Sequence, residues 1–421
     1  MGKSETPSTP PAGLGVYPQT IEAVPSLAVA SQRRPLLKKV LSALRLFAIN
    51  LAIFAVLAEL ASLIYINVVK WPSSKPNYRL NYNSFWTDIN PTFGVWHRAN
   101  GHYFHKGGCY NVEYTTNSYG ARDVERSVHS SRSRTIVLGD SFVEGMGLPT
   151  EDRLSNILEK DTGREHLNFG TGGDFGPLQY ALLYKTMAAE FDHDLVIVGV
   201  LPDNDFHDMS LAYWKAHGKG SRYRPYYADD LSVIYQGHFN PHEGEGFWNR
   251  VEAVLRAYLA SYHVGQYIYS RFYWRLRSPY SGYNDYTDVD LIRLEKALTD
   301  IRSTADAHHA KLAVFLIPTA NDFTRLHEAH MNRLGPALET WGKRVGVPVK
   351  DLLPDMEARS GGDYRSYFLS CDGHWSAHGS AVAANILEGW LGESLLEGMQ
   401  HAMGNQKLLA HYREKLGIVR K

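Results

Sequence analysis

The sequence has little cysteine and no excess of charge of either sign. Cys109 and Cys371 are the two cysteines among 421 residues, so at most one disulfide is possible, and their spacing does not decide whether they pair. The 44 basic and 44 acidic side chains give a formal net charge of zero, so nothing in the composition favours nucleic acid as a partner. The length suits one large α/β domain with extensions, and no internal repeat is apparent.

Long apolar runs are also scarce, and the exception lies near the N-terminus. Residues 46–69 are almost wholly apolar, about 24 residues or roughly 36 Å as a helix, which is long enough to cross a bilayer. Only Lys70 follows this run closely, whereas a basic cluster precedes it: Arg33, Arg34, Lys38, Lys39 and Arg45. The positive-inside rule therefore predicts a single-pass protein of the cell inner membrane, with a cytoplasmic N-terminus and a periplasmic main part. Glu59 interrupts the run, and because a carboxyl group within a membrane is costly, we expect it to contact another helix.

The segments outside the main domain differ from it in composition. Residues 1–32 are rich in Pro, Ser, Thr and Ala and are predicted to be a disordered cytoplasmic tail. Residues 71–130 are rich in Trp and Tyr and are expected to form a stalk or cap extension. Residues 398–421 are expected to form a C-terminal tail.

Beyond residue 130, strand-like and helix-like patterns alternate. The patterns predict strands near 135–138, 166–169, 195–201, 312–317 and 347–351, and helices near 178–190, 290–307, 324–344 and 377–396. This alternation predicts an α/β fold with a parallel sheet covered by helices on both faces. In such sheets the functional site forms at the carboxyl ends of the strands.

Two short motifs, far apart in the sequence, carry the side chains that serine-based acyl transfer needs. Gly139-Asp140-Ser141 follows the first predicted strand, and Asp372-Gly373-His374-Trp375 lies near the C-terminus. A serine hydroxyl is a poor nucleophile at neutral pH, so it requires a base within hydrogen-bond reach and a group that orients this base. We therefore predict Ser141 as nucleophile, His374 as base and Asp372 as its orienting group.

Two further segments between these motifs offer donors for an anionic intermediate. Residues 168–173 form a glycine-rich stretch whose backbone N–H groups are open, and Asn204 follows the strand predicted at 195–201. A donor aimed at the oxyanion is typically worth about 3–4 kcal/mol of barrier. The N–H groups of Ser141 and Gly173 and the side-chain amide of Asn204 are the predicted oxyanion hole.

These four blocks resemble those of the SGNH, or GDSL, hydrolase family. The resemblance covers roughly residues 131–397, and residues 116–123 are similar to the lead-in of membrane-anchored members. It implies a three-layer, flavodoxin-like hydrolase domain with strand order 2-1-3-4-5, an acyl-serine mechanism and no cofactor. The Asp-x-His-Trp form of the last block departs from the spacing of many members and looks like that of a branch containing polysaccharide O-acetyltransferases. The glycine block is one residue longer than usual, so Gly172 is an alternative donor to Gly173.

Other catalytic patterns fit less well. Val143 stands where the Gly-x-Ser-x-Gly elbow needs its second glycine. His374 and His378 are four residues apart, with Asp372 nearby, which resembles a metal site. A third firm ligand is not apparent, and His378 is expected in the first turn of the following helix, so no metal is predicted.

A long stretch, residues 207–288, separates Asn204 from the next predicted helix of the main domain. Its part 211–286 carries half of the tyrosines, with Trp214, Trp248 and Trp274 among them. These rings either line a lid or groove wall on which sugars stack, or fill the core of a helical subdomain around 249–276.

The two cysteines have an equally open interpretation. In an oxidising compartment, a bridge between Cys109 and Cys371 would pin the segment before the main domain to the loop that carries Asp372. The alternative is two separate buried thiols.

Together these features predict an outward-facing serine esterase or O-acyltransferase that acts on O-acyl, chiefly O-acetyl, esters of envelope or exported carbohydrate. A transferase of this kind would draw on a separate membrane acyl donor or a polysaccharide-assembly partner. Cleavage of lipid or lysophospholipid esters is a second hypothesis, which the membrane anchor also suits. A third is a non-catalytic, membrane-tethered polysaccharide-binding or assembly protein, against which the intact four blocks argue.

Overall fold

The computed structural model describes residues 33–68, 75–80, 85–217, 223–241, 246–275, 280–329 and 331–403. The chain divides into two compact units, Met1–Ala58 and Glu59–Lys421. The predicted tail 1–32 and residues 404–421 of the predicted C-terminal tail lie outside the described residues.

The first described element is the long apolar helix α1, Arg33–Val68. Its part Leu37–Val68 is long and apolar enough to cross a membrane, and the most apolar stretch of this part contains no buried residue. This helix begins before the predicted span of 46–69. Every side chain from residue 37 to residue 57 is exposed, which is the pattern of a helix that lacks a protein partner there.

The last turns of α1, from Glu59 onwards, belong to the second unit. The Glu59 carboxylate accepts hydrogen bonds from the backbone N–H groups of Ala260, at 2.7 Å, and Ser261, at 3.0 Å. These are the first two residues of helix α8, Ala260–Arg275, whose free N–H groups attract a carboxylate. Glu59 thus contacts another helix, as its position in the sequence led us to expect.

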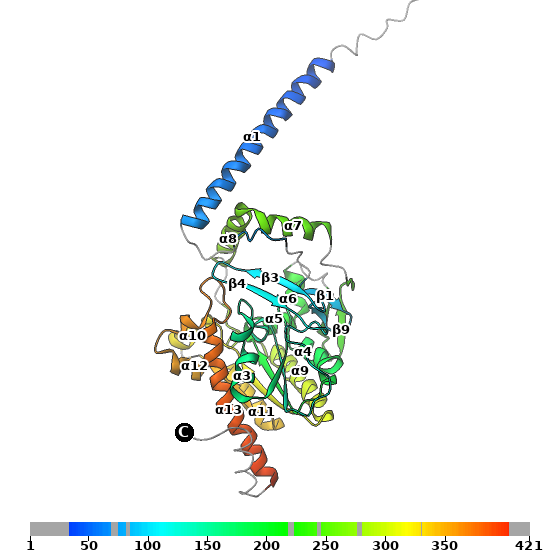
Figure 1. Cartoon of the computed structure of the whole chain (residues 1–421), viewed down its shortest axis with the longest axis vertical. Helices are drawn as coiled ribbons and strands as arrows, with labels where there is room; N and C mark the ends of the chain where they lie inside the picture. The colour runs from blue at the N-terminus through cyan, green and yellow to red at the C-terminus, as the bar shows by residue number, and fades with distance from the viewer. Residues whose placement is uncertain are drawn as a thin grey trace, which may run out of the picture. The chain divides into compact units, whose positions relative to one another are not determined.

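A five-stranded parallel sheet forms the centre of the second unit (Figure 1). Its order is β6-β5-β7-β10-β11, so the second strand of the sheet along the chain lies outside the first. All residues of β5, β6 and β7 are buried. Strand β7 is an unbroken apolar run, as expected of a strand covered on both faces, whereas β6 also buries Glu165, His166 and Asn168, each of which makes a hydrogen bond. The bounds of the five strands lie within two residues of the predicted positions: β5 Arg134–Gly139, β6 Glu165–Gly170, β7 Leu195–Val200, β10 Lys311–Leu316 and β11 Val349–Asp351.

Helices cover both faces of this sheet. Helix α3 (Leu154–Thr162) packs against α13 (Ala377–Met403), and α4 (Pro177–Thr186) packs against α9 (Asp288–Ala307). The chain moves from β5 to β6 in one direction and from β6 to β7 in the other, so right-handed crossovers place α3 and α4 on opposite faces. The remaining short helices of this domain are α2 Ser141–Glu144, α12 Leu352–Ser360, and the 3₁₀ turns Thr150–Asp152, Ala188–Glu190 and Tyr364–Tyr367.

The single helix predicted at 324–344 is wrong, because two helices occupy this region. They are α10, Ala320–Ala329, and α11, Leu334–Val345. Asn332 lies between the two helices and makes contacts that a continuous helix would not allow. Its Oδ1 accepts a hydrogen bond from Gly335 N–H at 3.1 Å, and its Nδ2 donates to Asp351 Oδ2 at 2.6 Å. Pro336 lacks an N–H and is therefore tolerated only in the first turn of the new helix.

The segment before the sheet consists of two antiparallel hairpins. They are β1–β2 (Thr87–Asn90, Gly94–Trp96) and β3–β4 (His102–Lys106, Asn111–Thr115). Phe93, Val95 and Trp96 belong to the same hydrophobic core as the sheet. The first hairpin is therefore part of the main domain's packing.

The aromatic side chains of the stretch 207–288 are partly buried and partly exposed. The stretch begins in the last turn of α5 (Pro202–Asp208) and contains α6 Leu211–Ala216, β8 Arg224–Tyr227, β9 Val233–Gln236, α7 Phe247–Tyr258 and α8. Trp214 and Tyr226 are buried, whereas Phe247 and Trp248 on α7 are 70% and 77% exposed. The side chain of Trp274 lies outside the described part of the chain. Helices α7 and α8 lie next to the β3–β4 hairpin (Figure 1).

Candidate active site

Ser141 lies at the point where β5 turns into α2. The Asp140 carboxylate caps this helix by accepting the Phe142 N–H at 3.0 Å, so Ser141 becomes its first residue. Gly170, at the end of β6, allows α2 to pack closely, because a Cβ there would lie 2.5 Å from the Glu144 backbone nitrogen. The turn fixes the Ser141 side chain at the carboxyl edge of the sheet.

The three residues predicted for the nucleophile, base and orienting group lie in hydrogen-bond contact. His374 Nε2 is 2.8 Å from Ser141 Oγ. His374 Nδ1 contacts Asp372 Oδ1, which also accepts the backbone N–H of His374 at 3.1 Å. The bond from the His374 backbone N–H holds the Asp372 carboxylate in place. The contact between Asp372 and Nδ1 orients the imidazole so that Nε2 faces the Ser141 hydroxyl.

Aromatic packing fixes the His374 ring from the side of α2. The Phe142 ring centroid lies 4.9 Å from that of His374 and 5.2 Å from that of Trp375, whose side chain is buried. The backbones of Trp375 and Phe368 also pair as in an antiparallel sheet, and this pairing closes the loop that carries Asp372. The tryptophan that follows the histidine in the sequence thus serves as packing for it.

The charges around His374 favour its protonated form. Burial lowers the pKa of His374, but the hydrogen bond and charge of Asp372, aided by Asp140 and Glu144, outweigh burial and raise it above its ordinary value. Burial raises the pKa of Asp372, and the contact with His374 more than reverses this, so the carboxyl pKa is lowered. Asp372 is therefore ionised when His374 acts as a base.

Asp140 is a second carboxyl next to the nucleophile, and we predicted no role for it from the sequence. Its Oδ2 lies 3.4 Å from Ser141 Oγ. Burial raises the pKa of Asp140 to about 6, although contacts with Phe142 N–H, His374 and the Asn204 side chain lower it. Its position in the middle of the Gly-Asp-Ser motif was the one indication in the sequence that Asp140 lies next to the nucleophile. That its carboxylate caps α2 follows only from the structure.

The candidate oxyanion donors fall into two groups. The Gly172 N–H donates to the buried carboxylate of Glu144 and is therefore occupied. In the described part of the chain, the N–H groups of Ser141 and Gly173 have no hydrogen-bond partner. Gly173 has φ of +84°, which a side chain would disfavour. Of the two glycines, Gly173 is the one with a free donor.

Asn204 lies in the first turn of α5, directly after β7. Its side chain hydrogen-bonds Asp140 and lowers the pKa of that carboxyl, and its buried Oδ1 has no hydrogen-bond partner among the described residues. Asn204 therefore sits beside the Asp140–Ser141 turn.

Glu144 is a fully buried carboxylate that ties the site to the first hairpin. It accepts from Trp86 Nε1 at 3.0 Å and lies 3.5 Å from His97 Nε2. Burial raises the pKa of Glu144, but His97, Arg122 and Trp86 together lower it below its ordinary value. Its role is to fix the glycine block through Gly172.

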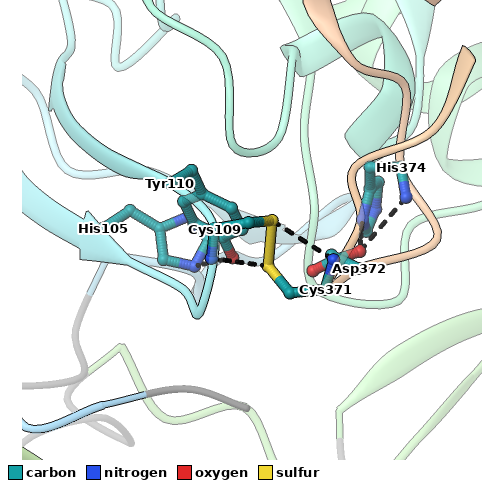
Figure 2. Close-up of a disulfide and its surroundings, with 6 residues drawn as sticks. All are labelled: His105, Cys109, Tyr110, Cys371, Asp372 and His374. Atoms are coloured by element: carbon teal, nitrogen blue, oxygen red, sulfur yellow. Dashed lines mark hydrogen bonds and ion pairs between the residues drawn. A yellow bond between two sulfur atoms is a disulfide. The ribbon is translucent and has the colours of Figure 1, made fainter. Parts of the chain in front are cut away.

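A disulfide between Cys109 and Cys371 links the β3–β4 hairpin to the loop that carries Asp372 (Figure 2). The two Cα atoms are 5.6 Å apart. The bridge is reinforced by Cys109 N–H donating to Cys371 Sγ at 2.8 Å and by Cys371 N–H donating to Cys109 Sγ at 3.2 Å. Of the two interpretations that the sequence left open, the structure has the paired form.

The same hairpin carries two further polar side chains, Tyr110, which hydrogen-bonds Asp372, and His105, which lies behind Tyr110 as seen from Asp372 (Figure 2). The Tyr110 hydroxyl is 3.1 Å from His105 Nε2, and His105 Nδ1 is 2.9 Å from the Tyr114 hydroxyl. Burial raises the pKa of Tyr110, and the negative charge of Asp372 raises it further. Burial lowers the pKa of His105 to about 4, so this ring is neutral and relays hydrogen bonds. Sequence reasoning missed both residues, because no local motif marks them.

The described residues contain no group of His, Cys, Asp or Glu side chains arranged to hold a metal ion. His378 lies in the first turn of α13, and its ring is 5.3 Å from that of Tyr367.

No family model matches the chain, and no curated protein matches it. Solved structures with some similarity include a GDSL-like lipase from Bacteroides thetaiotaomicron VPI-5482, at 10% identity over 64% of this chain and 93% of that chain, with a TM-score of 0.34. A lipase/acylhydrolase from Enterococcus faecalis is 12% identical over 61% of this chain and 96% of that chain, with a TM-score of 0.32. A member of the lipolytic G-D-S-L family from Veillonella parvula DSM 2008 is 11% identical over 60% of this chain and 94% of that chain, also with a TM-score of 0.32. At such TM-scores no conclusion about fold or activity follows, so the family stays a resemblance of motifs.

Proposed function

We propose that this chain is a serine esterase or O-acyltransferase with Ser141, His374 and Asp372 as its catalytic residues. The observation that carries the proposal is the chain of contacts from Ser141 Oγ to His374 Nε2, at 2.8 Å, and from His374 Nδ1 to Asp372. A hydroxyl, an imidazole and a carboxylate in this arrangement activate the hydroxyl for attack on an ester carbonyl.

The reaction follows from these contacts. As Ser141 Oγ attacks the ester carbonyl carbon, His374 Nε2 takes its proton, and the N–H groups of Ser141 and Gly173 with the Asn204 amide stabilise the oxyanion. The tetrahedral intermediate then expels the alcohol, which takes the proton from His374, and leaves an acyl-serine. Water or a sugar hydroxyl attacks this ester next and gives its proton to His374. The free acid or the new ester then leaves as Ser141 recovers its proton.

The substrate class that we propose is an O-acylated, chiefly O-acetylated, carbohydrate of the envelope or of an exported polysaccharide. Support comes from the exposed aromatic side chains on α7 and α8, such as Trp248 at 77% and Tyr269 at 67% exposure, because sugar rings stack on such faces. Transfer to a sugar hydroxyl would need a separate acyl donor in the membrane or a polysaccharide-assembly partner.

A lipid or lysophospholipid ester is the second candidate substrate. It is favoured by exposed apolar side chains on the same two helices, namely Phe247 at 70%, Val254 at 44% and Ile268 at 61% exposure. Such side chains suit contact with acyl chains.

We further propose an inner-membrane location with a periplasmic catalytic domain. The apolar helix Leu37–Val68 supports the membrane anchor, and the basic residues before it support a cytoplasmic N-terminus. The Cys109–Cys371 disulfide supports an oxidising compartment for the second unit.

The test is hydrolysis of 4-nitrophenyl acetate by the full chain in detergent, compared with Ser141→Ala. We expect the variant to lose about 1,000-fold or more of kcat/KM, with no effect of a chelator on the parent protein. Asn204→Ala should lower kcat about 100-fold, whereas Asn385→Ala, which removes a contact with Arg359 on the surface, should change nothing. Equal turnover in the parent and Ser141→Ala would end the proposal. Mass spectrometry of the products in the presence of an oligosaccharide acceptor then distinguishes the two reactions, because transfer gives an acylated oligosaccharide and hydrolysis gives the free acid.

A further inference from the structure

A cavity of about 140 Å³ lies where three parts of the second unit meet, and Tyr110 and His105 are among the residues that line it. It is lined by residues of the chain that follows α1, of the β3–β4 hairpin, and of α7 and α8. Figure 1 shows α7 and α8 beside this hairpin. The volume suits a compact group such as a phosphate and is small for a polysaccharide chain.

The lining of this cavity is positively charged. Lys75, Arg79, Lys106 and Arg256 contribute to it, and no carboxylate occurs among the described residues that line it. Lys106 Nζ donates to a backbone carbonyl, that of Pro76, at 3.3 Å. The Arg79 guanidinium lies over the Phe104 ring, 4.2 Å from its centroid. Neither of these two cations pairs with a carboxylate within the described part of the chain, whereas Arg256 pairs with Glu252 at 2.6 Å.

Two of these charges act on the same buried group. Burial lowers the pKa of His263, and the positive charges of Arg256 and Lys106 lower it further, against the hydrogen bond with the Arg256 carbonyl and the negative charge of Glu59, which raise it. His263 lines the cavity and contacts the Arg256 carbonyl at 2.7 Å through Nε2. Cations that converge on one cavity repel one another, and a bound anion removes this repulsion.

The surroundings of the cavity indicate where the anion comes from. Helix α8, which lines it through His263, is capped by Glu59 near the end of the apolar helix α1. Helix α7, which lines it through Arg256, exposes Phe247 and Val254, and exposed apolar side chains of this kind suit a membrane interface. Lipid phosphates are the anions concentrated at such an interface.

We propose that this cavity binds the phosphate of an anionic phospholipid headgroup. Ser141, Asp372 and His374 do not line this cavity, and the proposed binding goes beyond the proposed acyl chemistry. Lys106 and Arg256 provide the charge-assisted contacts, and the exposed side chains of α7 lie against the lipid.

The experiment uses the full chain in nanodiscs that contain equal amounts of phosphatidylglycerol and phosphatidylcholine. Native mass spectrometry after release counts the lipids that stay bound. We expect one phosphatidylglycerol to be retained preferentially, and Lys106→Gln and Arg256→Gln each to weaken its retention about 10-fold. Lys160→Gln, on the exposed end of α3, is the matched control and should retain lipid like the parent.

Each alternative outcome overturns the proposal in a distinct way. If phosphatidylglycerol is not retained in preference to phosphatidylcholine, the site is rejected. If Lys160→Gln weakens retention of phosphatidylglycerol as much as Lys106→Gln does, the lipid is held by general charge attraction and the site is rejected as well. Inorganic phosphate or an acidic oligosaccharide that binds with the same dependence on Lys106, while no lipid is retained, rejects the lipid as occupant. If Arg256→Gln lowers thermal stability, Lys106→Gln decides alone, because within the described residues the hydrogen bond of its Nζ goes to a backbone carbonyl. Hydrolysis of 4-nitrophenyl acetate should be unchanged in Lys106→Gln, which separates this result from a failure of the proposed catalysis.

Discussion

At the scale of single residues, the protonation state of His374 decides whether Ser141 can lose its proton. Only the neutral ring accepts a proton, and Asp372 raises the pKa of His374 above its ordinary value of 6.5. The rate of 4-nitrophenyl acetate hydrolysis should therefore fall as the pH drops through a midpoint above 6.5. Asp140, with a pKa raised to about 6, takes up a second proton at lower pH, so the acid limb should be steeper than for one group.

Asp372→Asn tests the origin of this midpoint. Loss of the carboxylate charge removes the largest favourable contribution to the imidazolium, so the acid limb should move to lower pH. The rate on the plateau should fall about 1,000-fold or more, because the orienting bond to Nδ1 is changed. An acid limb that stays in place would show that another group titrates.

Tyr110 is the residue through which we expect the β3–β4 hairpin to position Asp372. Tyr110→Phe removes the bond to His105, at 3.1 Å, and the hydroxyl beside the carboxylate. We expect kcat to fall about 3- to 10-fold with KM unchanged, at a cost of about 1 kcal/mol in the free energy of unfolding. The control is Tyr364→Phe, which removes a comparable hydroxyl contact, with Thr324 at 3.1 Å. If both variants lose the same stability and only the first changes kcat and the acid limb, Tyr110 acts on the site; equal kcat in both would reject this role.

The sequence predicted the residues that carry chemistry better than those that support them. Ser141, Asp372 and His374 stand in short motifs, each at the end of a strand or beside a helix, and a motif of this kind is visible without a fold. Tyr110 and His105 act across a hairpin turn on a loop far away in sequence, and such a contact has no local pattern. The choice between Gly172 and Gly173 likewise depended on Glu144, whose contact with Gly172 N–H required the packing of α2 against β6.

At the scale of elements, the disulfide holds the loop 369–375 against the β3–β4 hairpin. The two cysteines are 262 residues apart, so the bridge closes a very long loop in the unfolded chain. The double variant Cys109→Ser, Cys371→Ser should lower the free energy of unfolding by about 2–5 kcal/mol. The rate of ester hydrolysis should fall as well, because Asp372 follows Cys371 directly.

Thermal unfolding and hydrolysis with and without dithiothreitol measure this effect. The reductant should bring the parent protein to the values of the double variant and leave the double variant itself unchanged. A parent protein that keeps full activity after complete reduction would show that the loop needs no bridge.

The elements themselves were predictable to different degrees. Strands β7 and β10 follow from their continuous apolar runs, which are typical of strands buried on both faces, whereas β6 is equally buried and carries three polar side chains. The break between α10 and α11 was missed, although Pro336 in the middle of 324–344 is a signal against one continuous helix. The contacts of Asn332 between the two helices became known only with the fold. The order of the strands was implied by the family resemblance alone, since the residues do not encode which strands are neighbours.

At the scale of the whole molecule, Glu59 is the residue that joins the apolar helix α1 to the packing of the second unit. Its carboxylate satisfies two N–H groups at the start of α8, and nearby Ile66 is buried at 2% exposure. The apolar run alone places Glu59 inside a membrane segment, but a carboxylate that caps a helix needs no lipid to explain it. The last turns of α1 are therefore part of the folded unit.

Glu59→Ala should accordingly destabilise the folded unit and not the membrane association. Loss of two hydrogen bonds at the N-terminus of α8 should lower the free energy of unfolding by about 1–2 kcal/mol, measured by thermal unfolding of the full chain in detergent. Asn67→Ala, which removes a bond within α1 to Leu63 at 2.9 Å, is the control and should have a smaller effect. The fraction of the protein that sediments with membranes should be the same in both variants. Unchanged stability together with reduced membrane association would instead place the role of Glu59 within the bilayer, and α8 would then need another partner for its first N–H groups.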